Sequence, residues 1–170
     1  LKNLMIHSET QNFIEEEVKA YSSAKFSTIN KGEIYYVSPL SRVNINNKFL
    51  TDDAKSVQDQ FEMKKPDFNP FNNNLARVIE LMHCVDEAIE ILEKYIEKPP
   101  KDENKEFKIS AGTGAIATEA PRGLLNHSYK VDKNGIIQQA DVITPTAHNL
   151  NKIEDDTKKF APMIADQQDK

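Results

Sequence analysis

The sequence predicts an α+β fold that is mainly helical, with long bundle helices and a small antiparallel β-hairpin region. The first observation behind this prediction is an apolar residue at every third or fourth position from Leu75 to Ile96, the spacing of one helix face. The second is a cluster of glycines, since four of the five in the chain lie between Gly112 and Gly135. Near that cluster the apolar residues take the alternating spacing of strands.

A chain of 170 residues has the length of one ordinary domain. We therefore expect a single domain over 1–170 with four parts. These are a mainly helical part over 1–98, a charged linker over 99–106, a glycine-rich segment with a β-hairpin over 107–146, and a helix over 149–165.

The first part begins with a predicted helix and hairpin. Ser8 is a good cap residue, and the apolar residues after it have helical spacing, namely Phe13, Ile14, Val18 and Tyr21. Aromatic and β-branched residues flank Lys31-Gly32, so residues 26–37 predict a hairpin with its turn at that glycine.

Two further helices are expected in the middle of the chain. Thr51 is a cap residue, and the two aspartates after it suit the positive end of a helix, so we expect a helix to about Met63. The next helix should end at Pro99-Pro100 and be roughly 35 Å long, at about 1.5 Å per residue. Its apolar seam consists of Leu75, Val78, Met82, Val85, Ile89, Leu92 and Ile96. We expect the apolar seam to be buried in a bundle; a dimerising coiled coil is the alternative, but it needs more heptads.

Strands and a last helix are expected after the linker. Residues 107–109 alternate in polarity, and residues 131–143 predict two strands joined through Asn134-Gly135, a strong hairpin signal. Leu150, Ile153 and Phe160 then indicate a closing helix that is broken or ended near Pro162.

Composition excludes several classes of protein. The net charge is −5 and the basic residues are scattered, whereas nucleic-acid binding needs a basic face. No run of about 18 apolar residues occurs, so we expect no membrane insertion. A single cysteine rules out an internal disulfide framework and fits a reducing compartment.

Arg122 is the first candidate for a functional side chain, because it lies between Pro121 and Gly123. Proline fixes its own φ, and glycine lets other atoms approach closely, so this arginine stands on a rigid backbone. From the residues alone, the simpler interpretation is a structural arginine paired with a carboxylate such as Glu119.

The other reactive side chains have structural interpretations. We expect His127 to be a satisfied hydrogen-bond partner, and we assign no role to His148. Cys84 lies beside the apolar seam and is expected to be a small buried residue. His83 precedes it on the same helix, but neighbouring side chains there point about 100° apart and do not converge on a metal.

Three segments together resemble the large, catalytic subunit of nickel-iron hydrogenases. In that family a glycine-rich run leads into Glu-Ala-Pro-Arg-Gly, a hydrophobic pair and a His, which is the order from Gly112 to His127. A hairpin ending in Pro-Thr and an Asn follows, as in Thr144-Pro145-Thr146-Ala147-His148-Asn149. The segment Tyr35-Tyr36-Val37-Ser38-Pro39-Leu40-Ser41-Arg42-Val43-Asn44 is similar to the family's Tyr-x-Val-Gly-Pro-Leu-Ala-Arg-x-Asn, with Ser38 where glycine is usual. The resemblance covers roughly residues 30–160.

This resemblance implies a role for five residues around a nickel-iron centre with cyanide and carbonyl ligands. The family's match to Arg122 lies over the metal pair, with its guanidinium near the open coordination position, which makes Arg122 the expected catalytic residue. The match to Thr146 donates a hydrogen bond to a cyanide, and the match to Leu125 packs against the carbonyl. Pro121 and Pro145 would fix the backbone beside them.

The resemblance also shows what the chain lacks. The family binds its metals through two Cys-x-x-Cys motifs, whereas this chain has only Cys84. We therefore interpret it as an excised middle portion of a large subunit that, by itself, is inactive and holds no cofactor. The implied partners are the rest of the large subunit, further electron-transfer subunits and an iron-sulfur small subunit. The residues of these motifs are most similar to those of the soluble, cytoplasmic hydrogenases linked to F420, NAD(P) or heterodisulfide.

Two alternatives stay open at this point. The quinone-site subunit of respiratory complex I is homologous but has no metal, and its matching segment tends to read Pro-Arg-Gly-Glu, where this chain has Leu124. The second alternative is a non-enzymatic helical interaction module with an accidental motif match. That module would have an exposed apolar seam and no ordered pocket around Arg122.

Overall fold

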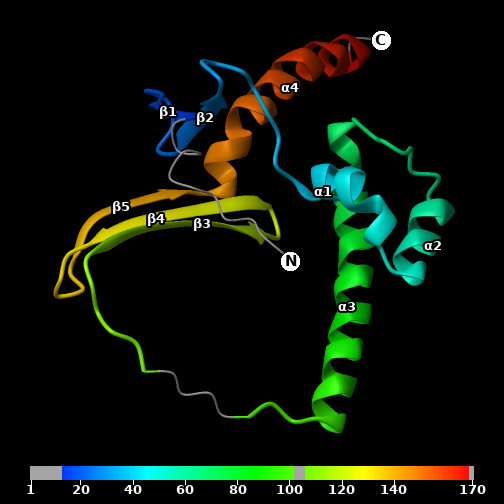
Figure 1. Ribbon diagram of the computed structural model, residues 1–170. Coiled ribbons are helices and arrows are strands. Elements are labelled where there is room, and N and C mark those ends of the chain that lie inside the picture. Colours follow the sequence, from blue (N-terminus) through cyan, green and yellow to red (C-terminus); the bar gives the residue numbers. More distant parts are fainter. Residues whose placement is uncertain (1–12, 102–105, 169–170) are drawn as a thin grey trace. The chain divides into compact units, whose positions relative to one another are not determined.

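The computed structural model describes residues 13–101 and 106–168 (Figure 1). Its contacts group into two compact units. The sheet unit consists of residues 1–38 and 109–170, and the helical unit of residues 39–108. Antiparallel sheets and helices occupy separate stretches of the chain, so the predicted α+β, mainly helical class is confirmed. The single domain over 1–170 stays a prediction.

A strand stands where we expected the first helix. β1 (Ile14–Val18) pairs antiparallel with β2 (Lys25–Ile29), and Glu16 forms an ion pair with Lys25 at 2.8 Å. The helix prediction was wrong because a short run of apolar residues fits both the helical and the strand repeat. Backbone pairing with β2 selects the strand. The predicted cap, Ser8, lies outside the described residues.

The turn predicted at Lys31-Gly32 is present, but the hairpin around it is short. Asn30, Lys31 and Gly32 have positive φ angles of 48°, 67° and 113°. Ile29 and Glu33 exchange both backbone hydrogen bonds, at 2.8 and 3.0 Å, and pairing stops there. β2 therefore takes β1 as its main partner, and residues 34–37 do not form the predicted strand.

The second sheet has three antiparallel strands in the order β3-β4-β5. They are β3 (Gly112–Ala120), β4 (Gly123–Val131) and β5 (Ile137–Ile143). The β3–β4 hairpin was not predicted, because the glycines and alanines of β3 give no alternating apolar pattern. Residues 107–109, for which we expected strand character, have no regular structure.

The turn predicted at Asn134-Gly135 joins β4 and β5 and is confirmed. The Asp132 carboxylate accepts hydrogen bonds from the N–H groups of Asn134 and Ile136, at 2.8 and 3.0 Å. Gly135 has a φ of 79°, a conformation that favours glycine.

The last helix, α4 (Pro145–Gln168), is longer at both ends than predicted. Thr144 caps it, since its hydroxyl accepts from the Ala147 N–H at 3.3 Å, and proline suits the first helical position. Pro162 lies inside the helix and does not end it. The i,i+4 ion pairs Glu154–Lys158 and Asp155–Lys159 support the turns before it.

Polar side chains join α4 to the β1–β2 hairpin. Glu154 accepts from Lys19 at 3.0 Å and from the Tyr21 hydroxyl at 2.8 Å. The Asn151 amide donates to the Ser27 carbonyl at 3.0 Å. These contacts explain why α4 buries several polar residues and gave a weak apolar signal.

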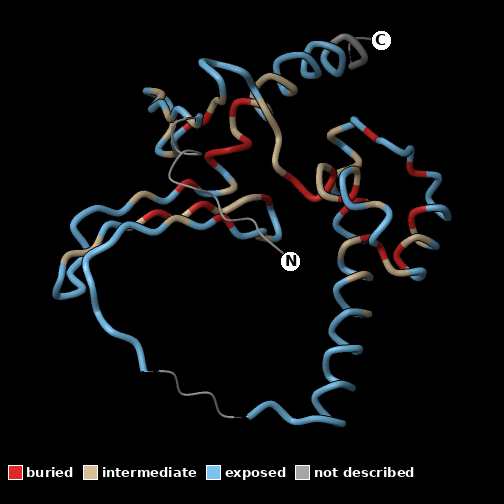
Figure 2. Tube along the Cα trace, viewed as in Figure 1, coloured by how far each residue is buried: buried red, intermediate tan, exposed pale blue. Residues whose placement is uncertain are grey.

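The described residues of the helical unit form three helices and two short 3-10 turns. They are α1 (Pro39–Asn46), η2 (Asn47–Phe49), α2 (Asp52–Gln60), η3 (Pro70–Asn72) and α3 (Asn73–Glu97). The predicted Thr51 cap is confirmed by its bond from the Ala54 N–H at 3.4 Å. α2 ends three residues before Met63, where Glu62 takes a φ of 50°. The core consists of Leu40, Val43, Leu50, Ala54, Met63, Ala76 and Ile79 (Figure 2).

The long helix α3 is present as predicted, but its buried face is not the apolar seam. Ala76 and Ile79 are fully buried, whereas Ile89 is 52% exposed and Ile96 is 81% exposed. Cys84, which we expected to be buried, is also exposed. Both predictions were wrong because they took the buried face of the helix from the spacing of apolar residues alone.

Polar contacts select the face of α3 that packs against α1 and α2. Glu80 receives a two-point ion pair from Arg42, with nitrogen–oxygen distances of 2.6 and 2.7 Å. Asp86 accepts from the Thr51 hydroxyl at 2.5 Å, and Thr51 N–H donates to His83 at 3.3 Å. These polar residues lie on the same side of the helix as Ile79, so a hydrophobic count misses that side.

One carboxamide joins three distant segments of the sheet unit. Asn149 accepts from the Val37 N–H and donates to the Val37 carbonyl, both at 2.9 Å, and donates to the Arg122 carbonyl at 3.2 Å. Beside it, Gly123 has a φ of 144°, and a Cβ there would lie 2.1 Å from the Val37 oxygen. Only glycine permits this approach.

We expect Ile79→Ala to lower the free energy of unfolding by about 2–5 kcal/mol, because it leaves a cavity in the core. Ile89→Ala is the matched control on the exposed side of the same helix, and it should cost less than about 1 kcal/mol. Urea unfolding of the chain measures both. A larger loss in Ile89→Ala would contradict this assignment of the buried face.

We expect Gly123→Ala to destabilise the sheet unit by more than about 3 kcal/mol, because a strained φ and a clash with backbone are added together. Gly114→Ala is the control, since a Cβ there meets nothing within 4 Å, and it should change stability by less than about 1 kcal/mol. Thermal unfolding compares the two variants. Equal stabilities would show that the backbone of Val37 does not press on residue 123.

Candidate functional site

Arg122 occupies the tight turn between β3 and β4. Ala120 pairs with Gly123, so Pro121 and Arg122 alone form the turn, and both are exposed. Within residues 13–101 and 106–168 the Arg122 guanidinium has no hydrogen bond and no ion pair, and it does not pair with Glu119. The simpler interpretation as a structural arginine is therefore not supported by a contact.

Pro145 and Thr146 lie in the first turn of α4, directly after β5. The last residue of β5, Ile143, pairs with Asn126 near the start of β4, so α4 begins at the end of the sheet that carries the Pro121–Arg122 turn. Thr146 is exposed and lies three residues before Asn149, on the same side of the helix. The structure thus brings the turn and the start of α4 to one end of the sheet (Figure 1).

Leu125 is the fifth predicted residue and lies in β4, opposite Thr118 of β3. It is half-buried. Neighbouring residues of a strand face opposite sides of the sheet, so Leu125 faces away from the buried side chain of Asn126. All five predicted residues therefore lie within the sheet unit, which also contains the Asn149 carboxamide.

The second motif divides between the two units. Tyr35 and Val37 belong to the sheet unit and contact α4, whereas Arg42 and Asn44 belong to the helical unit. Asn44 exchanges hydrogen bonds with the backbone of Asp67 at 2.7 and 3.0 Å. Arg42, which pairs with Glu80, and Asn44 thus hold the helical unit together.

His148 was given no role from the sequence, but the structure buries it completely. Its Nδ1 is hydrogen bonded to the Tyr35 hydroxyl, and burial lowers the His148 pKa to about 4. Burial also raises the Tyr35 pKa to about 12. Both groups are therefore neutral near pH 7 and bind the Tyr35–Val37 segment to α4. A polar residue on a buried helix face leaves no apolar periodicity by which it could have been found.

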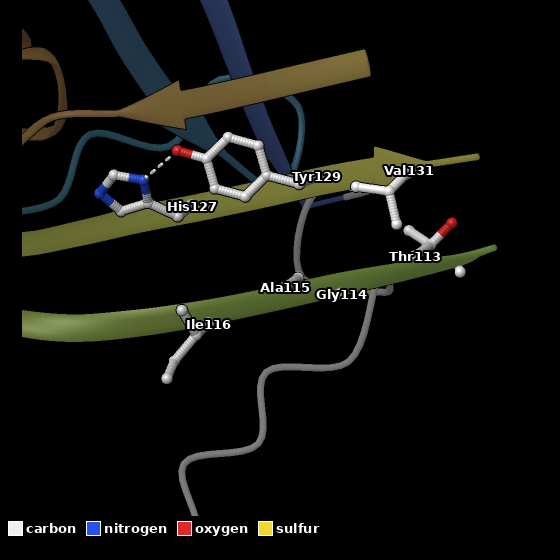
Figure 3. Close-up of a pocket in the computed structure, with 8 residues that line it drawn as sticks. Thr113, Gly114, Ala115, Ile116, His127, Tyr129 and Val131 are labelled. Carbon is white, nitrogen blue, oxygen red and sulfur yellow. Dashed lines mark hydrogen bonds between the residues drawn. The ribbon is translucent and has the colours of Figure 1, made fainter. Parts of the chain in front are cut away.

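A shallow depression of about 470 Å³ lies on the face of the β3–β4 hairpin (Figure 3). It is lined by Gly112, Thr113, Gly114, Ala115, Ile116, His127, Tyr129 and Val131. His127 Nδ1 is 2.9 Å from the Tyr129 hydroxyl, as expected for a hydrogen-bonded structural histidine. The depression extends toward Gly112 and Val131, the hairpin end opposite Arg122, and contains none of the five predicted site residues.

The described residues contain neither a cluster of metal ligands nor a membrane-spanning helix. Among the described residues, no three His, Cys, Asp or Glu side chains gather so that they could hold a metal ion. The five residues predicted for the site are instead a cation, a hydroxyl, two prolines and a leucine. In the described part of the chain, no helix has the length and apolar character needed to cross a membrane.

Comparison with known proteins identifies the family. Residues 4–164 match the family model described as nickel-dependent hydrogenase. The alpha chain of sulfhydrogenase 1 from Pyrococcus furiosus is 37% identical over 151 residues, covering 89% of this chain and 35% of the relative. An F420-non-reducing hydrogenase of Methanothermobacter thermautotrophicus is 36% identical over 156 residues, covering 87% of this chain and 32% of the relative.

Solved structures agree with these matches. An NAD⁺-reducing [NiFe]-hydrogenase in the H2-reduced state has a TM-score of 0.63 and 25% identity, covering 83% of this chain and 32% of its own. A [NiFeSe]-hydrogenase of Dm. baculatum has a TM-score of 0.59 at 24% identity, covering 78% of this chain and 28% of its own, and shows the shared fold.

These matches decide between the interpretations that the motifs left open. The motifs are not an accidental feature of a helical module, although the exposed apolar seam is what that module would have. The matching family model is that of the hydrogenases and not of a quinone-site subunit. The chain spans about a third of the length of the relatives it matches. Over that third, the chain belongs to the nickel-dependent hydrogenase family.

Proposed function

We propose that this chain is the middle part of the catalytic subunit of a nickel-iron hydrogenase, an enzyme that cleaves H2 reversibly into protons and electrons. The observation that carries the proposal is the Arg122 turn, a backbone held by Asn149 and Gly123 that presents a guanidinium without a partner among the described residues. Family membership supports it, because the turn has the Glu-Ala-Pro-Arg-Gly sequence that resembles the family's site.

Five residues would enclose a nickel-iron centre with cyanide and carbonyl ligands: Pro121, Arg122, Leu125, Pro145 and Thr146. The described residues include no set of metal ligands, so the ligands would come from elsewhere in the subunit. The bound centre supplies the chemistry that breaks the H–H bond. This chain would supply hydrogen bonds, fixed charge and exclusion of water around it.

Arg122 would be the catalytic residue of this set. Its planar guanidinium offers several N–H donors to an anionic ligand and stays charged at every physiological pH. A cation held on a rigid backbone stabilises negative charge that develops nearby during reaction, without reorganising first. Pro121 restricts the turn before it, and the Arg122 carbonyl is held by Asn149 after it.

Thr146 and Leu125 would have complementary roles. Thr146 carries its hydroxyl in the first turn of α4, where the partial positive charge of the helix end also favours an anionic ligand. Leu125 would face the uncharged carbonyl, where an apolar side chain leaves no polar group unpaired. Pro145 would fix the chain at the helix start.

The remaining subunits are part of the proposal. An exposed apolar seam on α3 fits a helix that packs against the rest of the large subunit, since only a third of the relatives' length is present. We further propose an iron-sulfur small subunit, additional electron-transfer subunits and a cytoplasmic location. The solved NAD⁺-reducing hydrogenase supports a cofactor-linked group, whereas the name F420-non-reducing of another relative gives no support to F420 as the electron acceptor.

In the intact enzyme, we expect Arg122→Lys to retain its nickel but to lose turnover on the order of 10²-fold or more. Lysine keeps the positive charge but lacks the planar set of N–H donors of a guanidinium. Thr146→Val should lose less and should shift the infrared bands of the cyanide ligands. Rates of H2 oxidation and infrared spectra measure these effects. Arg77→Lys, an exposed site on α3, is the control and should behave as wild type.

Wild-type turnover and unchanged infrared bands in Arg122→Lys would mean that Arg122 is only a structural arginine. A similar loss in Arg77→Lys would mean that the assay reports general damage.

We also expect the 170-residue chain, purified alone, to bind no stoichiometric nickel and to have no hydrogenase activity. The reason is that it has one cysteine, whereas thiolate-rich nickel-iron sites need several. Metal analysis after dialysis tests this. Tightly bound nickel at one equivalent per chain would show that the ligands lie within these residues.

A further inference from the structure

The Asn149 side chain uses both of its amide protons and its oxygen. The oxygen accepts from the Val37 N–H at 2.9 Å, and the nitrogen donates to the Val37 carbonyl at 2.9 Å and the Arg122 carbonyl at 3.2 Å. Asn149 is 6% exposed, so water does not replace these bonds easily. The bonds to both the N–H and the carbonyl of Val37 distinguish the oxygen of the Asn149 amide from its nitrogen. The second proton of that nitrogen then points to the Arg122 carbonyl.

This bond acts on the backbone that carries the Arg122 side chain. Holding the Arg122 carbonyl fixes the plane of the peptide between Arg122 and Gly123. Gly123 has a φ of 144° and lies against the Val37 oxygen, so the chain after the turn has no room to move. Pro121 restricts the chain before it. Since no described residue holds the guanidinium, the backbone alone sets the direction in which the side chain leaves the turn.

We propose that Asn149 is a positioning residue for Arg122: it anchors the turn to α4 and thereby orients the guanidinium toward the reacting group. This inference rests on the proposed function of Arg122. The Asn149 carboxamide would affect the reaction through its bond to the Arg122 backbone. It would not contact the substrate or the metals itself. The same bonds tie the start of α4, with Thr146, to the turn, so both polar site residues share one anchor.

The alternative is that Asn149 only stabilises the fold, and the chain contains a matched control for that role. Asn151 lies on the same helix, is 8% exposed, and donates from its amide to the Ser27 carbonyl at 3.0 Å while accepting from Lys19 at 3.0 Å. It joins α4 to strand β2, whereas Asn149 joins α4 to Val37 and to the turn. Asn151 does not contact the Arg122 turn.

The experiment compares Asn149→Ala and Asn151→Ala in the intact, metal-loaded enzyme. We expect Asn149→Ala to retain nickel, to shift the infrared bands of the iron ligands and to lose turnover on the order of tenfold or more, because small displacements of a catalytic group are costly. Asn151→Ala should leave the bands unchanged and turnover within about twofold, even where its melting temperature falls similarly.

A double-mutant cycle separates positioning from general stability. If Asn149 acts through Arg122, adding Asn149→Ala to Arg122→Lys should lower turnover by less than about twofold more, because residues that act together are not additive. Adding Asn151→Ala to Arg122→Lys should change turnover by the same factor as Asn151→Ala does in the wild-type enzyme. Full additivity of Asn149→Ala with Arg122→Lys would overturn the inference.

Three other results would also overturn it. One is an Asn149→Ala enzyme with wild-type bands and turnover while Arg122→Lys is impaired. Another is loss of nickel in both Asn149→Ala and the milder Asn149→Gln while Asn151→Ala keeps its metal, which would make Asn149 structural. If Arg122→Lys itself is fully active, the proposed function of the turn fails first, and the inference fails with it.

Discussion

The contact between Gly123 and Val37 is the constraint on which the sheet unit depends. The Val37 oxygen occupies the space that any side chain at residue 123 would need, at 2.1 Å from the position of a Cβ. The approach is stabilised because the Asn149 carboxamide satisfies Val37 and the Arg122 carbonyl together. Asn149 lies 112 positions after Val37 and 27 after Arg122, so this side chain connects three separate segments of the chain. One of these segments is the turn that carries Arg122.

The same constraint explains the order of residues around the turn. Proline before Arg122 and glycine after it are needed for different reasons, the first for a fixed φ and the second for a positive φ and a close approach. Thr144 then starts α4 beside the turn, so that Asn149 reaches the Arg122 carbonyl from the beginning of that helix. His148 holds Tyr35 from the preceding position of the same helix.

Much of the fold follows from local signals in the sequence. Thr51 before two aspartates, Asn134-Gly135 between two strands and the long α3 were found because caps, turns and long helices depend on nearby residues. The residues of the candidate site were found through their resemblance to a family, since a single Pro-Arg-Gly sequence has no unique structural meaning. The rigidity expected at that turn, however, was predicted from proline and glycine alone.

The failures have a common physical cause, which is that partners distant in sequence decide the outcome. Strand β2 makes a strand of residues 14–18, and Arg42 and Thr51 select the polar side of α3 as its packed face. Buried polar residues such as His148 and Asn149 were missed as parts of the core because hydrogen bonds, and not apolar contacts, hold them there. The apolar seam lies uncovered on a chain that spans a third of its relatives' length.

The most direct measurement is a crystal structure of the intact, metal-loaded subunit that contains this chain. The account predicts that the Arg122 guanidinium lies within hydrogen-bond distance of a ligand of the metal centre, while Asn149 keeps its bonds to Val37 and the Arg122 carbonyl. A structure in which Arg122 instead pairs with Glu119, or points away from the metals with the turn detached from Asn149, would contradict it.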